Sequence, residues 1–241
     1  MKRKIFCMVM GLVLLTGGQV LAADATAVVD LNSAYVWRGI TFNDGLVAQP
    51  SIDVTNGSFG INVWGNFDID DYDDSLDDNE FSEVDITLYY GFSLQQLEIE
   101  LGLAEYLFPA GGEGTRELYA SLGWPIAGGL SLGMTAYYDA DEVDGWYGNL
   151  SLSYGLDITD ALGIEASAAA GLADKDFAAA YGGQDSGWYD YCFSLGASYA
   201  VTEALSLGVN INYTDTLDED VLPDEIVDSN LYGGISITYS F

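Results

Sequence analysis

Apolar and polar residues alternate along most of the chain after residue 24. The last segment is the clearest, because Ile235, Ile237, Tyr239 and Phe241 alternate with small or polar residues. A period of two predicts a β-strand whose two faces meet different environments. Most such segments have about the 9–11 residues that a tilted membrane strand requires. Twelve segments share the pattern, namely 25–40, 46–55, 58–67, 81–92, 95–106, 115–124, 129–139, 145–156, 161–172, 187–200, 205–214 and 231–241.

The connections between these segments alternate between two kinds. After every second segment the connection is short, as at 55–57. Most of the others are longer and often acidic, as at 68–80 and 215–228, although those near 42–45 and 140–144 are brief. Outer-membrane barrels have this asymmetry, with tight periplasmic turns and longer outer loops. An even strand count with both chain ends on the periplasmic side agrees with it.

Aromatic residues on the apolar phase lie near both ends of the segments, as in the two girdles of a transmembrane barrel. A soluble β-sandwich or lipocalin-like barrel alternates in the same way, with its apolar face inside. The girdles and the near absence of Lys from the polar face favour the membrane. We therefore predict an all-β fold, a transmembrane antiparallel up-and-down β-barrel of 12 strands. The girdle residues are Phe59, Phe92, Trp124, Tyr154, Tyr199 and Phe241 toward the short connections, and Trp37, Phe67, Tyr138, Trp146, Tyr189 and Tyr213 toward the long ones.

The first residues have the order of a secretory signal peptide. Lys2, Arg3 and Lys4 precede an apolar run, and Ala22 ends a stretch of small residues that suits cleavage. The apolar run is shorter than the ~20 residues that a membrane-spanning helix needs. We predict a signal peptide over 1–22 and an outer-membrane barrel over 23–241, in a Gram-negative bacterium.

The composition excludes several classes of function. The chain has 6 Lys and Arg against 38 Asp and Glu, and only Arg38, Arg116 and Lys175 lie outside the predicted signal peptide. Nucleic acid is excluded as a partner, because phosphate contacts need Lys and Arg. The chain has no His, which removes the usual general base and the commonest metal ligand. We therefore expect neither an enzyme nor a cofactor.

If the apolar phase faces lipid, the other phase lines the interior. Charged groups are tolerable there but not against hydrocarbon, and rings of Asp and Glu favour cations. Inward aromatic residues either fill space in a small barrel or stack on a flat or sugar-like solute. The predicted pore-lining residues are Arg38, Asp53, Trp64, Asp85, Glu98, Glu100, Glu117, Tyr119, Tyr137, Asp139, Tyr147, Glu165 and Asp190, and Asp30, Tyr89 and Tyr232 share their phase.

Two of the long connections, 68–83 and 214–228, are strongly acidic. Carboxylate oxygens at this density are ligands for Ca²⁺ or Mg²⁺. The EF-hand pattern does not fit, because Asn79 stands at position twelve from Asp68. A solvated rim that accumulates cations diffusely is the simpler interpretation. The residues that would take part in such diffuse cation binding are Asp70, Asp71, Asp73, Asp74, Asp77 and Asp78.

The run Tyr35-Val36-Trp37-Arg38-Gly39-Ile40-Thr41 resembles the opening strand of the TorF family of proteobacterial outer-membrane porins. The stretches 59–66 and 83–91 are similar to that family as well, so that the resemblance covers about the first third of the barrel. In that family Gln usually follows the Ser or Thr, whereas Phe42 stands here. The terminal Phe241 resembles the signal read by the barrel assembly machinery. The resemblance implies a porin but no particular substrate.

These patterns predict a channel for passive diffusion of small solutes, with a preference for cations that its acidic lumen provides. The expected partners are outer-membrane lipid and lipopolysaccharide, the barrel assembly machinery, and small solutes or cations. The alternative is a closed structural or adhesive barrel, whose acidic outer loops bind divalent cations or a partner. Conductance separates the two, because a closed barrel gives none.

Overall fold

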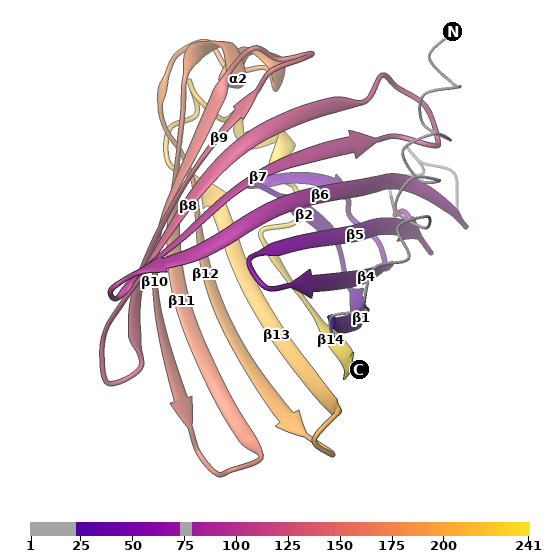
Figure 1. Cartoon of the computed structure of the whole chain (residues 1–241). Helices are drawn as coiled ribbons and strands as arrows, with labels where there is room; N and C mark the ends of the chain where they lie inside the picture. Colours follow the sequence, from indigo (N-terminus) through magenta and orange to yellow (C-terminus); the bar gives the residue numbers. More distant parts are fainter. Residues whose placement is uncertain (1–22, 73–78) are drawn as a thin grey trace, which may run out of the picture.

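The computed structural model describes residues 23–72 and 79–241, which form a closed antiparallel barrel (Figure 1). Consecutive barrel strands pair, and β1 pairs with β14 to close the sheet. The predicted all-β barrel of twelve strands is confirmed, whereas the predicted signal peptide over 1–22 lies outside the described residues. The barrel strands are β1 (Asp24–Asn32), β4 (Val47–Asn56), β5 (Phe59–Asp68), β6 (Glu80–Leu94), β7 (Leu97–Leu107), β8 (Thr115–Ala127), β9 (Leu130–Asp139), β10 (Trp146–Asp157), β11 (Leu162–Ala173), β12 (Gly187–Ala200), β13 (Leu205–Thr216) and β14 (Leu231–Ser240).

The outer surface of the barrel is apolar. On β10, Leu150, Leu152 and Tyr154 are between 40% and 46% exposed, whereas the alternate residues Ser151 and Ser153 are half-buried on the inner face. This is the reverse of a soluble barrel, in which the apolar phase fills the interior. In the part of the chain that the structure describes, no helix is both long and apolar enough to cross a membrane.

Short turns join the strands at one end of the barrel. Asn56 pairs with Phe59 across a two-residue turn in which Gly57 has a positive φ of 62°. Leu94 pairs with Leu97 across a similar turn. Two-residue turns of this kind match the twist of antiparallel strands. At the other end, the connections after β1, β11 and β13 are longer and pack together over the mouth of the barrel.

The first of these longer connections forms a hairpin of its own, which corrects the predicted strand 25–40. Strand β1 ends at Asn32, and β2 (Tyr35–Trp37) and β3 (Ile40–Asn43) pair only with each other. The turn between them has positive φ at Arg38 and Gly39, 50° and 82°. Gly takes such a conformation without a steric cost, so that Arg-Gly marks a tight turn here.

Two other connections carry short helices. Helix α2 (Lys175–Ala180) follows β11 and lies at the top of Figure 1. Its N-cap Asp174 accepts a hydrogen bond from the backbone N–H of Phe177 at 2.9 Å. The 3₁₀ helix η1 (Asp224–Ile226) lies between β13 and β14.

Strand β12 contains a bulge that changes which side chains point inward. The register of β11 and β12 shifts between Ala170 and Leu172, so that both Tyr189 and Asp190 lie opposite Gly171. Tyr189 is fully buried inside the barrel as a result. Its predicted place in the outer aromatic girdle is therefore wrong.

Candidate functional site

Three connections together close the outer end of the lumen, and we call them the plug. They are the hairpin 33–46, the segment 174–186 that holds α2, and the segment 217–230. Their apolar side chains form one cluster with the barrel wall, and each of its core members is at most 4% exposed. The core of the cluster consists of Ile40, Tyr147, Ala173, Phe177, Ala178, Tyr189, Val221, Leu222 and Val227.

Trp37 belongs to this cluster and not to the lipid face. Its ring centroid lies 6.1 Å from that of Phe177 and 5.7 Å from that of Tyr181. The prediction that Trp37 forms part of the outer girdle is therefore wrong, because β2 has left the barrel wall. Burial raises the pKa of Tyr181 to about 12.

Arg38 lies at the centre of the plug. Its Nη1 and Nη2 donate to the two carboxylate oxygens of Glu117 on β8, at 2.7 and 2.6 Å. The guanidinium also lies 4.1, 4.3 and 4.5 Å from the ring centroids of Trp37, Tyr137 and Tyr147, which is cation–π geometry. Burial lowers the pKa of Arg38, but hydrogen bonding and the charge of Glu117 raise it to a net value above the ordinary one. Arg38 is therefore charged, and Glu117 neutralises it.

The hairpin also contacts the barrel wall at β5 and β6. Tyr35 donates a hydrogen bond to Glu83 on β6 at 2.9 Å, and its ring lies 5.5 Å from that of Trp64 on β5. Near the base of the hairpin, Asn43 donates to Asp68 at 2.7 Å. The hairpin is thus held by β5 and β6 as well as by Glu117 on β8.

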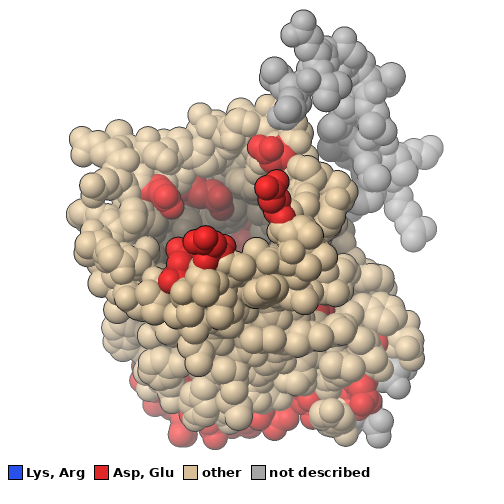
Figure 2. Space-filling view, turned by 90° about the horizontal axis from the view of Figure 1, so that it is seen from below, with Lys and Arg blue, Asp and Glu red and all other residues tan. Residues whose placement is uncertain are grey.

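Beneath the plug the lumen is hollow and acidic. A cavity of about 380 Å³ includes Glu98 and Glu100 in its lining, and one of about 280 Å³ nearer the plug shares Glu100 and Ser121 with it. The two form one trough along β6 to β9. A third cavity of about 390 Å³, lined in part by Asp30 and Trp64, lies along β1, β4, β5, β13 and β14. Figure 2, seen from the side of the β10–β11 and β12–β13 turns, shows a hollow bordered by acidic side chains, with no basic side chain visible on that face.

Tyrosines of the lumen pair with carboxylates on other strands. Each phenol donates to its partner at 2.7–2.9 Å, so that the ring narrows the lumen while its hydroxyl holds an acidic side chain in place. The sequence gives no local signal for these pairs, because they depend on strand register. The pairs are Tyr89 with Asp53, Tyr106 with Glu117, Tyr119 with Glu100, and Tyr147 with Asp190.

The other predicted pore-lining residues have different surroundings. Arg38 is on the hairpin and not on a barrel strand, and Tyr137 packs beside it. Asp85 lies on β6 opposite Trp64, and its Oδ1 is buried without a hydrogen-bond partner. Glu165 is exposed on β11, where it pairs with glycines of β10 and β12 near the end with short turns.

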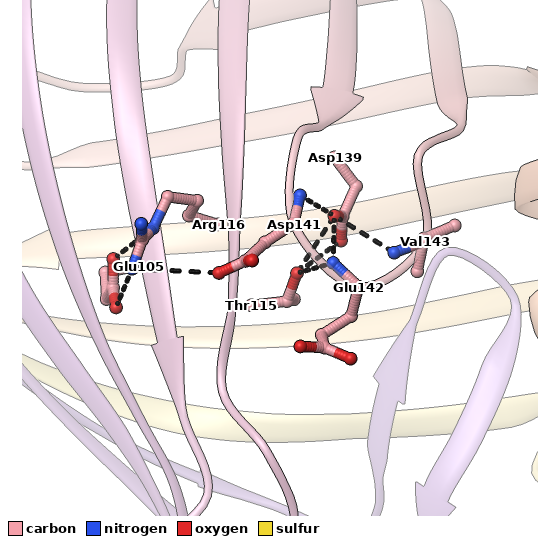
Figure 3. Close-up of polar contacts among 7 residues, drawn as sticks. All are labelled: Glu105, Thr115, Arg116, Asp139, Asp141, Glu142 and Val143. Atoms are coloured by element: carbon pink, nitrogen blue, oxygen red, sulfur yellow. Dashed lines mark hydrogen bonds and ion pairs between the residues drawn. The ribbon is translucent and has the colours of Figure 1, made fainter.

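Asp139 has a structural role at the outer end of β9 (Figure 3). Its Oδ1 accepts hydrogen bonds from the backbone N–H groups of Asp141, Glu142 and Val143 at 2.9–3.2 Å, and Thr115 donates to the same carboxylate. Asp139 is 2% exposed. Its charge therefore orders the β9–β10 connection, and Val143 from that connection packs on the plug cluster.

Replacing Asp139 by Ala is expected to loosen this connection. The substitution leaves backbone donors unpaired, which costs about 1–3 kcal/mol of unfolding free energy. Amide hydrogen exchange of residues 140–145 should accelerate. Asp141→Ala is the matched control, because it removes only the exposed contact with Arg116 at 3.7 Å (Figure 3) and should change stability by less than about 1 kcal/mol. Equal exchange rates in the two variants would contradict this role.

The structure does not assemble a metal site from the acids that it describes. Among residues 23–72 and 79–241, no three acidic or Cys side chains are grouped so as to hold a metal ion. Asp70 and Asp71 lie in the connection after β5, where Asp70 accepts a hydrogen bond from the backbone of Asp71. The other predicted cation-binding acids, Asp73, Asp74, Asp77 and Asp78, lie outside the described residues.

Comparison with solved structures identifies the fold. The chain is similar to the KdgM porin in complex with disordered oligogalacturonate, with a TM-score of 0.57, 10% identity, and coverage of 90% of this chain and 99% of that one. It is similar to the NanC porin (TM-score 0.52, 13% identity, 91% and 99% covered). It is also similar to the COG4313 outer membrane channel from Pseudomonas putida F1 (TM-score 0.58, 9% identity, 93% and 97% covered). The fold is therefore that of outer-membrane porins.

Comparison of the sequence gives the family. No curated protein matches the chain. The comparisons do not name the TorF family, so that resemblance stays a prediction. A family model described as "Bacterial protein of unknown function (Gcw_chp)" matches residues 20–231. The chain belongs to this Gcw_chp family of bacterial proteins.

Proposed function

We propose that the protein is an outer-membrane, porin-like channel for passive diffusion of small solutes, with a preference for cations. The observation that carries this proposal is the charge of the lumen. Asp30, Glu98 and Glu100 face its cavities. Within the described residues, the one basic side chain of the lumen is Arg38, which Glu117 already neutralises. A narrow passage lined by one sign of charge concentrates counter-ions and repels co-ions.

The outer surface supports a membrane location. Apolar side chains face outward along the strands, and Trp124, Tyr154 and Tyr199 are about half exposed near the end with short turns. We infer that the exported chain resides in the outer membrane and contacts lipid and lipopolysaccharide there. Phe241 is 74% exposed, and its backbone N–H bonds Ala25 at the closing seam of the barrel. It is the residue that we expect the barrel assembly machinery to bind.

The ligand of the KdgM structure does not suit this lumen. Oligogalacturonate is a chain of acidic sugars, and carboxylates of like sign in a narrow lumen repel it. Small cations and uncharged solutes meet no such barrier. The shared fold therefore supports passage of solutes but not of that class of substrate.

The double substitution Glu98→Gln and Glu100→Gln should weaken cation preference. Under a KCl gradient across a planar bilayer, the reversal potential of the variant should move toward zero relative to wild type, more at 0.1 M than at 1 M salt. The reason is that the Debye length falls from about 10 Å to about 3 Å between these concentrations. Glu105→Gln is the control, because Glu105 lies on the same strand but pairs with Arg116 outside the lumen. Unchanged reversal potentials in the double variant would refute the acidic-pore mechanism.

The plug favours a second candidate, a closed structural or adhesive barrel. Its buried cluster and the Arg38–Glu117 pair fill the outer end of the lumen. Single-channel recording of the refolded mature protein separates the two functions. Steady conductance supports the channel, whereas no conductance from protein shown to be folded and inserted supports the closed barrel.

A further inference from the structure

We propose that the hairpin 33–46 is a displaceable plug and that the Arg38–Glu117 ion pair is the latch that keeps it closed. The inference rests on the proposed channel function, because a latch matters only where solutes pass. It adds a gated state to that function and assigns the gate to one pair of side chains.

The hairpin is able to leave the lumen without breaking the barrel. Strands β2 and β3 form a separate two-stranded sheet, and the hydrogen bonds of the barrel sheet continue from β1 directly to β4. The chain enters and leaves the hairpin beside Asn32 and Val47, which are paired in the wall. Withdrawal therefore breaks side-chain contacts such as Tyr35–Glu83 and Arg38–Glu117, together with a few backbone hydrogen bonds at Ser33 and Leu46, while the barrel register stays intact.

The ion pair lies where the passage is interrupted. On its outer side is a cavity of only about 30 Å³, which includes Glu117, Tyr106 and Trp37 in its lining. That is room for about one water molecule. On its inner side begins the cavity of about 280 Å³ that forms the upper part of the trough, and this cavity shares Tyr106 with the outer one. The Arg38–Glu117 pair therefore separates the outer space from the acidic lumen.

Arg38 places a positive charge in a buried layer that is rich in acidic side chains. Glu83, Glu117 and Asp139 all line the outer cavity, and each is at most 6% exposed. The guanidinium compensates the charge of Glu117 alone in this group, and both side chains of the ion pair are under 10% exposed. Since a buried charge without a partner is strongly unfavourable, the hairpin stays seated until Arg38 and Glu117 separate and are hydrated, or until another cation replaces Arg38.

The latch is tested by removing either partner. Arg38→Met keeps an apolar stem without the charge, and Glu117→Gln keeps the shape of the acceptor. Arg116→Met is the matched control, because it breaks the exposed Arg116–Glu105 pair, whose side chains are 47% and 34% exposed. All variants carry Cys192→Ser and a reporter, Ile40→Cys, at a position that is 4% exposed while the plug is seated.

Two measurements are made on protein shown to be folded by circular dichroism. The first is the rate at which a membrane-impermeant maleimide labels residue 40, and the second is mean conductance in a planar bilayer. Both should rise at least about tenfold in Arg38→Met and Glu117→Gln, and neither should rise in Arg116→Met.

The outcomes separate the latch from the channel. Labelling and conductance that both rise as expected support the latch. If labelling rises but no variant conducts, the displaceable plug is supported and the channel function is overturned. If the wild type conducts, and labelling and conductance are the same in both latch variants as in the wild type, the latch is overturned and the channel function stands.

Discussion

Replacing residues 33–46 with an Asn-Gly dipeptide is expected to give a permanently conducting barrel. Asn32 and Val47 lie directly opposite each other in the β1–β4 register. A two-residue Asn-Gly turn is the preferred link between such strands, so the wall should close without the hairpin. The variant removes Arg38 together with Trp37, so the outer and inner cavities should become continuous. Mean conductance in a planar bilayer should rise by at least about tenfold, because the narrowest section is gone.

The control for this replacement shortens a connection outside the plug. Residues 109–113 lie in the connection between β7 and β8, and all of them are exposed. An Asn-Gly link there should leave conductance within about twofold of wild type. If the hairpin-free variant is folded but conducts no more than wild type, the segments 174–186 and 217–230 close the mouth by themselves. In that case the hairpin is not the gate.

The barrel was predictable because each strand carries its own local pattern. Alternation along 145–156 or 205–214 shows which set of side chains is apolar, and a one-residue error in register would move that set to the other face of the sheet. The even number of such segments favours a sheet that closes into a barrel. The wall strands therefore needed no knowledge of long-range contacts.

The plug was not predictable from the same pattern. Tyr35 and Trp37 alternate with polar or aliphatic residues as a wall strand does, so the run 25–40 looks continuous. The signal that would have divided it is Arg38-Gly39, which forms the positive-φ turn. Burial of Trp37 against Phe177 joins residues far apart in the chain, and periodicity contains no information on such a contact.

The same distinction applies to the lumen. Inward acidic residues are recognisable from the alternation of the strand, but whether each is paired or faces a cavity depends on partners on other strands. Glu117 is neutralised by Arg38 and also accepts from Tyr106, whereas Glu98 faces a cavity. Phase also predicted Asp190, but not the bulge opposite Gly171 that turns Tyr189 inward beside it. No alternation pattern reports such a bulge.

The largest expected loss of stability comes from a charge on the outer surface of the barrel. Leu150 lies midway along β10 between the aromatic residues Trp146 and Tyr154, and it is 40% exposed on the outer face. An Arg at the bilayer midplane of a transmembrane barrel costs about 2–4 kcal/mol. Leu150→Arg should therefore lower the free energy of unfolding by that amount, measured by reversible urea unfolding in lipid vesicles.

Ser151→Arg is the matched control at the same depth. Ser151 faces inward and pairs with Gly133 and Ala169, whose small side chains leave room in an acidic interior. A lumen substitution changes selectivity more than stability, so the loss should stay within about 1 kcal/mol. The opposite ranking, with Leu150→Arg neutral and Ser151→Arg severe, is the result that a soluble barrel gives, because its outer face is in water and its interior is a packed core. The pair of variants therefore tests the assignment of the outer face to lipid without relying on any measurement of transport.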